Sequence, residues 1–369
     1  RSYPPVVALG PHLKWTLCVL KGRHAFLSPH IGDLDTPQAR DFFGETLALM
    51  ERIARCRPVV VARDLHPGYW STLVAERLGR ERVIPVQHHH AHIASALADN
   101  GITGKVIGLS MDGTGYGTDG RVWGCEFLEA DEGDFRRLGH HRYFRLPGGD
   151  RAVREPWRIA LALLRDVQGE DAFSRAEALG ILPPHIPGAL LEKMMAGNLN
   201  SPEASSLGRL FDGAAAVLGI RTVARFEGQA AMELEGLAAR AEEEDGPVLP
   251  YTLSKAGETG LLDLSPALAA LVEGRSGGRE IEPLAMDFHR TVIDALFSLT
   301  AVLGEKTGLD RVVLSGGCFQ NRILFPGLVK KLESRGFRVY GHRQVPPNDG
   351  GIALGQAVVA GTRVDRDGT

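Results

Sequence analysis

The chain has 369 residues and a formal net charge of −3, from 42 lysine and arginine residues and 45 aspartate and glutamate residues. Acidic and basic residues are interspersed, which argues against a nucleic-acid or membrane surface, and no segment approaches the roughly 20 apolar residues that span a bilayer. The four cysteines are scattered and form no CxxC pair. A disulfide framework or a cysteine zinc site is therefore not expected, and a reducing cytoplasm fits.

Apolar patterning predicts two series of alternating elements. The first series comprises strands at 6–9, 15–20 and 25–28, a helix at 37–55, a strand at 58–62, a helix at 71–78, a strand at 82–86 and a helix near 88–98. The second comprises strands at 105–111, 121–128 and 135–140, a helix at 284–303, a strand at 311–314, a helix at 321–334, a strand at 338–340 and a helix at 351–360. A helix-rich insertion interrupts the second series.

Two βββαβα-type halves predict an α/β protein made of duplicated ribonuclease-H-like lobes with a cleft between them. This is the layout of the actin-like ATPase and sugar-kinase (ASKHA) folds. We assign residues 1–100 to an N-terminal lobe, 101–149 together with 281–369 to a C-terminal lobe, and 150–280 to the helical insertion.

Histidines are concentrated where a predicted strand meets a predicted helix: His88, His89, His90 and His92 fall within five positions. Residues four apart share one face of a helix, so His88 and His92 can point at one ion. Neutral imidazole is the commonest protein ligand for metals. A polar helix start with solvated histidines is the alternative interpretation. The His-x3-His spacing favours metal, which leaves His89 and His90 to surround the metal or a substrate.

A glycine-rich turn follows the strand at 105–111 and contains Asp112, Gly113, Thr114 and Gly115. Glycines in such a turn let backbone N–H groups approach phosphate oxygens closely. Asp112, the first residue after the apolar run, would project into the cleft as a metal ligand. An ordinary glycine-rich hairpin is the alternative, but the duplicated fold favours phosphate binding.

Two more glycine-rich turns precede predicted helices. Gly316 and Gly317 permit close approach of a nucleotide, and the helix start that follows favours negative charge. The alternative is a tight turn between strand and helix, which alone would need only one glycine. Cys318 is not expected to be a nucleophile, because no particular histidine is placed beside it by the sequence. Asp349 is either a helix N-cap or a further metal ligand facing the cleft.

The candidate ligands together have a chemistry that restricts the metal. His88, His92, Asp112 and Asp349 would form a mixed nitrogen and oxygen site suited to Fe or Zn. A magnesium site made of oxygen ligands would not normally recruit two histidines.

The insertion contributes two polar motifs. Ser206 is a plausible helix cap, and Asp212 and Glu227 could accept hydrogen bonds from ribose hydroxyls. Capping and surface charge explain the same residues equally well, so the pattern alone leaves both interpretations open.

In combination, these motifs resemble one family, the Kae1-like C-terminal region of HypF, the carbamoyltransferase of [NiFe]-hydrogenase maturation. The resemblance extends over nearly the whole chain and rests on nine stretches: LSPHIGDLD, RDLHPGYWST, VQHHHAHIASALA, LSMDGTGYGTDGRVWGCEFL, LPGGDRAVREPWR, SLGRLFDGAAAVLG, FEGQAAMELE, LSGGCFQNRIL and PPNDGGIALGQAVVA. Their order along the chain is that of the family.

The resemblance implies roles for individual residues. A divalent metal, Fe or Zn, would be held by His88, His92, Asp112 and Asp349, which would also be the catalytic residues. An adenine nucleotide would approach this metal with its phosphates and would be bound by Asp112, Gly113, Thr114, Gly115, Asp212, Glu227, Gly228, Gly316, Gly317 and Asn321.

The resemblance also implies a reaction. Carbamoyl phosphate and ATP, with Mg for the adenylation step, give carbamoyl-adenylate, and the carbamoyl group passes to the C-terminal cysteine of a partner, HypE. That thiocarboxamide is the source of the cyanide ligand of the hydrogenase iron.

Full-length members of the family carry acylphosphatase-like, zinc-binding and YrdC-like domains ahead of this region, and none is visible here. The transfer half of the reaction is therefore what these residues support. Three alternatives stay open: a small-molecule O-carbamoyltransferase, the tRNA threonylcarbamoyl-transfer relative, and a nucleotide-binding docking scaffold without catalytic activity. The lack of a basic stripe disfavours the tRNA enzyme.

Overall fold

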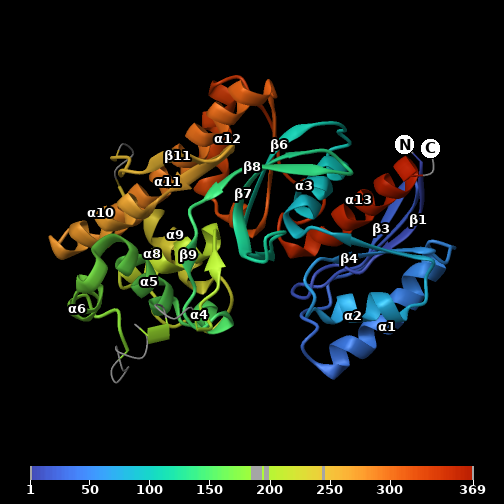
Figure 1. The fold of residues 1–369 in the computed structure, drawn as a ribbon, viewed down its shortest axis with the longest axis horizontal. Coiled ribbons are helices and arrows are strands. Elements are labelled where there is room, and N and C mark those ends of the chain that lie inside the picture. Colours follow the sequence, from blue (N-terminus) through green and yellow to red (C-terminus); the bar gives the residue numbers. More distant parts are fainter. Residues whose placement is uncertain (1, 184–192, 195–198, 243–245, 368–369) are drawn as a thin grey trace.

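The computed structural model describes residues 2–183, 193–194, 199–242 and 246–367, which form two α/β lobes and a mainly helical region beside the second lobe (Figure 1). The stretches 184–192, 195–198 and 243–245 of the predicted insertion lie outside the described residues. Over the part of the chain that is described, no helix has the length and apolar character needed to cross a bilayer.

The first lobe is built on a sheet that has five strands among the described residues, in the order β3-β2-β1-β4-β5. Its strands are β1 (Tyr3–Ala8), β2 (Cys18–Gly22), β3 (His24–Leu27), β4 (Val60–Asp64) and β5 (Arg82–Val86). Side chains alternate between the two faces of each strand. One face, with Val7 and Val61, packs on α1 (Pro37–Ile53) and α2 (Trp70–Arg77).

The second sheet, as far as the described residues show it, has the main order β11-β12-β8-β7-β6-β13-β14. Its strands are β6 (Val106–Tyr116), β7 (Val122–Ala130), β8 (Phe135–His141), β11 (Thr252–Ala256), β12 (Thr259–Asp263), β13 (Arg311–Ser315) and β14 (Arg338–Tyr340). The short strands β9 (Phe144–Arg145) and β10 (Glu203–Ala204) pair with each other, and β10 also pairs with β7. Helices α11 (Ile281–Thr307) and α12 (Leu324–Ser334) connect to β13 and β14.

The two sheets share one connectivity. The run β8-β7-β6-β13-β14 repeats β3-β2-β1-β4-β5, and each pair of strands has the same relative direction in both sheets. In each half, the central strand is antiparallel to the strand that follows it and parallel to the strand after the first crossover helix. The predicted duplication is confirmed.

Two helices lie between the sheets, α3 (His88–Asp99) and α13 (Ile352–Asp367) (Figure 1). Both bury apolar side chains against the first sheet, and α3 also packs against the second. They cross closely, because a Cβ atom on Gly355 would lie 1.8 Å from the carbonyl oxygen of Ala91. Helix α13 falls within the range 281–369 that the sequence analysis assigned to the second lobe, and its apolar face covers the first sheet.

The insertion is mostly helical, with α4 (Asp150–Arg154), α5 (Pro156–Gln168), α6 (Ala172–Ala178), α8 (Leu207–Val217), α9 (Gln229–Ala238) and α10 (Ser265–Ser276). It also contains a hairpin that the sequence analysis did not predict. Strands β11 and β12 form this hairpin, and β12 pairs in parallel with β8, so the insertion extends the second sheet.

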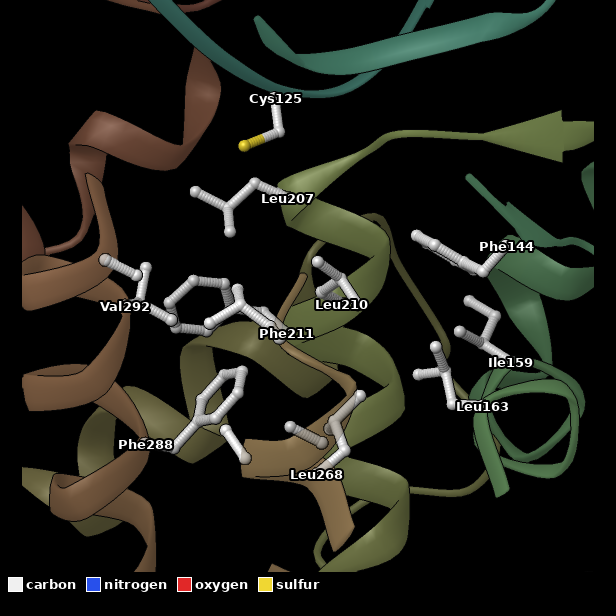
Figure 2. Packing of buried hydrophobic residues seen from close by; sticks show 14 of the residues in the cluster. Cys125, Phe144, Ile159, Leu163, Leu207, Leu210, Phe211, Leu268, Phe288 and Val292 are labelled. Carbon is white, nitrogen blue, oxygen red and sulfur yellow. The ribbon is translucent and has the colours of Figure 1, made fainter. Parts of the chain in front are cut away.

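Helix α8 is fixed at the centre of the largest apolar core. Figure 2 shows Leu207, Leu210 and Phe211 pointing from α8 into this core, with Phe288 and Val292 of α11 facing them. The rings of Phe211 and Phe288 have centroids 5.3 Å apart in an edge-on arrangement. Since each fully buried side chain of this size contributes about 1.5–3 kcal/mol, this packing holds the opposite, polar side of α8 in place beside the cleft.

Candidate metal and nucleotide site

Four side chains from three separate parts of the chain converge in the cleft: His88 and His92 from α3, Asp112 from β6 and Asp349 from the short 3-10 helix (Asp349–Gly351) before α13. One ligand atom from each lies within 4.8 Å of all the others. The Nε2 atoms of His88 and His92 lie 3.2 and 3.3 Å from Asp112 Oδ2, and each lies 3.7 Å from Asp349 Oδ1. The four predicted ligands are thus brought together at one point.

The start of α3 explains why only two of the clustered histidines face this point. Gln87 caps the helix, because its side-chain oxygen accepts a hydrogen bond from the backbone N–H of His90 at 2.8 Å. His88 and His92 then stand one turn apart on the same face. His89 is hydrogen-bonded to Gln87 at 3.0 Å, and His90 contacts the carbonyl oxygen of Asp131 at 2.8 Å. His89 and His90 are buried and do not belong to the four-residue cluster.

A carboxylate that the sequence analysis did not single out orients His88. Asp64, at the end of β4, is fully buried, and its Oδ2 atom lies 3.0 Å from His88 Nδ1. Its other oxygen accepts a hydrogen bond from the backbone N–H of His66 at 2.9 Å. A carboxylate accepts hydrogen bonds, so Nδ1 of His88 is the donor in this contact, and Nε2, on the other side of the ring, faces Asp112 at 3.2 Å.

His92 and Asp112 are held by a similar outer layer. Ser315 Oγ lies 3.3 Å from His92 Nδ1 and 2.8 Å from His342 Nε2, so one hydroxyl links the two rings. The backbone N–H of Gly317 donates to Asp112 Oδ1 at 3.2 Å, which leaves Oδ2 facing the histidines. Such outer hydrogen bonds fix the orientation of metal ligands and tune their affinity.

The electrostatics of the cluster favour a bound cation. Burial opposes charge on His88, but Asp349, Asp112 and Asp64 outweigh it and hold its pKa well above the usual value. Burial raises the pKa of Asp112, yet contact with His88 and His92 lowers it well below the usual value. Lone pairs of imidazole and carboxylate meet here, and this arrangement is stable only with a proton or a metal ion between them. The residues present therefore fit a divalent metal.

A cavity of about 600 Å³ opens beside the cluster, and Asp112 and Asp349 line it. Its walls come from the β1–β2 loop, β6, α8, α9 with the turn before it, and the turns around 317–323 and 348–349. Six of the predicted nucleotide-binding residues line this cavity: Asp112, Gly113, Glu227, Gly228, Gly317 and Asn321. The apolar part of the lining includes Phe211, Ala231, Met232 and Ile323.

The other four predicted nucleotide-binding residues lie outside the lining. A Cβ atom on Gly115 would lie 2.5 Å from the ring of His89, and one on Gly316 would lie 2.2 Å from the carbonyl oxygen of Met111. These glycines make room for protein atoms. Thr114 is half-buried in β6, and Asp212 is buried in α8 against Arg209, with 3.0 Å between Arg209 Nη2 and Asp212 Oδ2.

The cavity is also lined by cationic residues that the sequence analysis did not name. Arg209 is buried in the first turn of α8 and was quoted only as part of the GRLFD motif. Lys14 comes from the β1–β2 loop of the first lobe, and its Nζ atom lies 2.6 Å from Oε2 of Glu227, which precedes α9. No local pattern around Lys14 indicates this contact, which joins residues more than two hundred positions apart.

The duplicated sheets and the cleft between them define an α/β protein of the actin-like ATPase and sugar-kinase class. Comparison with known sequences is more specific. The family model "HypF Kae1-like domain" matches residues 1–99, and "Carbamoyltransferase, Kae1-like Domain, second subdomain" matches residues 108–356. The chain belongs to the HypF Kae1-like carbamoyltransferase family.

Individual relatives agree with this assignment. Carbamoyltransferase HypF2 of Cupriavidus necator is 43% identical over 98% of this chain and 47% of its own length, and the carbamoyltransferase HypF homolog of the same organism is 39% identical over 97% and 92%. A crystal structure of full-length HypF in a phosphate- and nucleotide-bound form superposes with a TM-score of 0.93 at 40% identity, covering 99% of this chain and 47% of that one. The HypF structure from T. kodakarensis gives 0.87 at 28% identity, covering 99% and 48%. The chain spans about half the length of most of these relatives.

Proposed function

We propose that this chain transfers a carbamoyl group from carbamoyl-adenylate to the C-terminal cysteine of a HypE-type partner, in the synthesis of the cyanide ligand of [NiFe]-hydrogenase. The observation that carries the proposal is the shared wall of two sites. Asp112 and Asp349 belong to the cluster of four potential ligands and also line the 600 Å³ cavity. A ligand in the cavity would therefore have its reacting end beside the cluster.

An adenylate suits the two ends of the cavity. Phe211, Met232 and Ile323 offer apolar surface for a base, and the carboxylate of Glu227 in the same lining offers hydrogen-bond acceptors. This division of a mostly apolar pocket with a few polar groups is typical of small-molecule sites. The phosphate- and nucleotide-bound HypF relative supports the same assignment.

In the proposed site, a divalent metal, Fe or Zn, would be held by His88, His92, Asp112 and Asp349. Its chemistry when bound is Lewis-acid stabilisation of negative charge on the acyl oxygen and the departing phosphate. Asp64 and Ser315 keep the histidine rings in the orientation that ligation needs.

The nucleophile of the proposed transfer comes from the partner. Its thiolate sulfur attacks the carbamoyl carbon, the bond between that carbon and the phosphate oxygen breaks, and AMP leaves. The chain's own Cys318 lines the cavity, but burial raises the pKa of its thiol well above the usual value. A protonated thiol is a poor nucleophile, so Cys318 does not compete with the incoming cysteine.

Formation of carbamoyl-adenylate from carbamoyl phosphate and ATP with Mg is the remaining half of the proposed pathway. The chain spans about half of the longer relatives, so supply of the adenylate by another domain or protein is part of the proposal. Cytoplasmic action is in keeping with four cysteines that form no disulfide.

The test supplies the intermediate directly. Purified chain is mixed with carbamoyl-adenylate and a peptide ending in cysteine, and mass spectrometry records addition of one carbamoyl group. We expect transfer by the wild-type chain and loss of both metal and transfer in His88→Ala and Asp349→Ala. Nucleotide binding without transfer to any acceptor would favour a docking scaffold, and transfer only to a hydroxyl acceptor would favour an O-carbamoyltransferase.

A further inference from the structure

Among the residues that the structure describes, Lys14 is the one from the first lobe that lines the cavity. Its ammonium group is paired with Glu227 at 2.6 Å, and this pair spans the cavity between the β1–β2 loop and the turn that begins α9. Both side chains remain partly open to solvent, with 34% of Lys14 and 48% of Glu227 exposed. An ion pair with this exposure contributes little net stability, so it exchanges partners readily.

The backbone at Lys14 is held in an unfavourable conformation. Its φ angle is +48°, in the left-handed region that residues with a Cβ atom rarely occupy. The backbone N–H of Lys14 donates to Asp33 Oδ1 at 2.8 Å, and the hydroxyl of Thr16 donates to the carbonyl oxygen of Gly350 at 2.9 Å. Strain of this kind persists where surrounding contacts impose it, and it is concentrated at functional sites. Here the contacts fix the loop beside Asp349.

The charges around the cavity give Lys14 a specific task. Carboxylates of Asp112, Glu227, Glu235 and Asp349 line the cavity and would repel a phosphate group. Among the cationic lining residues, Arg209 is buried against Asp212 and Arg322 is exposed. Burial acts to lower the pKa of Lys14, but Glu227, Asp349 and Asp112 outweigh it and raise that pKa, so the ammonium group stays charged. Lys14 is thus a charged group with a weakly held partner, in the wall of the cavity and within electrostatic reach of Asp112 and Asp349.

We propose that Lys14 selects ligands that carry a phosphate, by exchanging Glu227 for the phosphate oxygens of the bound nucleotide. The exchange also frees the carboxylate of Glu227 to accept a hydrogen bond from the ribose. A nucleoside without a phosphate leaves the Lys14–Glu227 pair closed and gains neither contact. The inference rests on the proposed nucleotide site and adds to it the group that discriminates nucleotide from nucleoside.

Calorimetric titration with AMP and with adenosine tests this selection. Lys14→Met removes the charge and Lys14→Arg keeps it. Lys105→Met is the control, because Lys105 also forms an ion pair, with Glu129 at 2.5 Å, and does not line the cavity. We expect Lys14→Met to weaken AMP binding about 10- to 100-fold, the value of a charge-assisted hydrogen bond. Adenosine affinity should stay within about threefold of wild type. Lys14→Arg should retain most of the preference for AMP, and Lys105→Met all of it.

Other results would overturn the selection. Unchanged AMP affinity in Lys14→Met, or equal weakening of AMP and adenosine, would mean that Lys14 does not recognise phosphate. Loss of AMP binding in Lys14→Arg as large as in Lys14→Met would assign the residue a structural role in the loop. If the wild-type chain bound neither AMP nor adenosine, the nucleotide site of the proposed function would be refuted, and phosphate selection by Lys14 with it. This outcome is recognised from the wild-type titrations alone, before any variant is compared.

Discussion

Replacing Asp64 with asparagine should weaken metal binding without removing any ligand. The carboxylate of Asp64 keeps the proton of His88 on Nδ1, 3.0 Å away, and so leaves Nε2 free to bind metal. An asparagine has nearly the same shape, and its oxygen can still accept from His66 N. Its NH2 group, however, can donate to Nδ1 of His88, which moves the ring proton to Nε2, the atom that faces Asp112.

The expected size of the effect follows from the kind of contact. Loss of a carboxylate behind a ligating histidine typically costs 10- to 100-fold in metal affinity, which corresponds to about 1.4–2.7 kcal/mol. Zn²⁺ titration against a competing chelator measures it. Asp131→Asn is the matched control. Like Asp64, Asp131 accepts a hydrogen bond from the backbone N–H two residues later, here that of Gly133 at 2.7 Å, but it lies outside the ligand cluster. We expect Asp131→Asn to bind Zn²⁺ like wild type.

Two outcomes would refute this reasoning about His88. If Asp64→Asn bound Zn²⁺ as tightly as wild type, the carboxylate would have no part in setting the tautomer. If Asp131→Asn lost as much affinity as Asp64→Asn, the effect would reflect general loosening of the fold. Thermal unfolding of both variants without metal separates this second case from a local one.

Two predictions concern stability. Burial lowers the pKa of His289 to about 4 from a reference value of 6.5. Between these two pH values His289 binds a proton in the unfolded chain but not in the folded chain. The free energy of unfolding therefore falls as the pH falls through this range. His289→Gln should reduce this acid loss by up to about 3 kcal/mol, measured by urea unfolding at pH 7 and pH 4; an unchanged difference between the two pH values would contradict the assignment. Gly355→Ala should destabilise the protein by about 1–3 kcal/mol or more and weaken Zn²⁺ binding, because the added Cβ atom would collide with α3. Gly44→Ala, inside α1 with open space around it, should be neutral or stabilising by up to about 1 kcal/mol; equal effects of the two glycine substitutions would rule out the close crossing as the cause.

The parts of the fold that sequence could predict are those encoded by local periodicity. The strand and helix order of both halves follows from apolar patterning, and the pairing of His88 with His92 follows from helix geometry. Asp112 was predicted as the first residue after an apolar run, and Asp349 as an acid at a strand-helix junction. The expected turn at Asp112 is wrong, because β6 continues to Tyr116. The hairpin β11–β12 was missed, because all five residues of β11 are exposed and carry no apolar alternation.

Contacts over long sequence distances were less predictable. Asp64 ends a buried strand next to the one that leads into α3, and this position was the available signal for it. Lys14 offered no such signal, since its partner Glu227 lies in the insertion. Gly115 illustrates another limit, because a glycine needed beside an imidazole ring has the same sequence signature as a glycine needed beside a phosphate.

The packing of α13 on the first sheet has a consequence for biosynthesis. One face of that sheet, formed within the first hundred residues, is covered by side chains of residues 352–360. During translation this face stays exposed to water until residues 352–360 have left the ribosome, and until then it is a surface for chaperones or for aggregation. Asp349 directly precedes the same helix, so we expect the order of synthesis to make completion of the first lobe and arrival of the fourth ligand a single late event. A nascent chain would accordingly lack the complete set of four ligands until Asp349 has emerged.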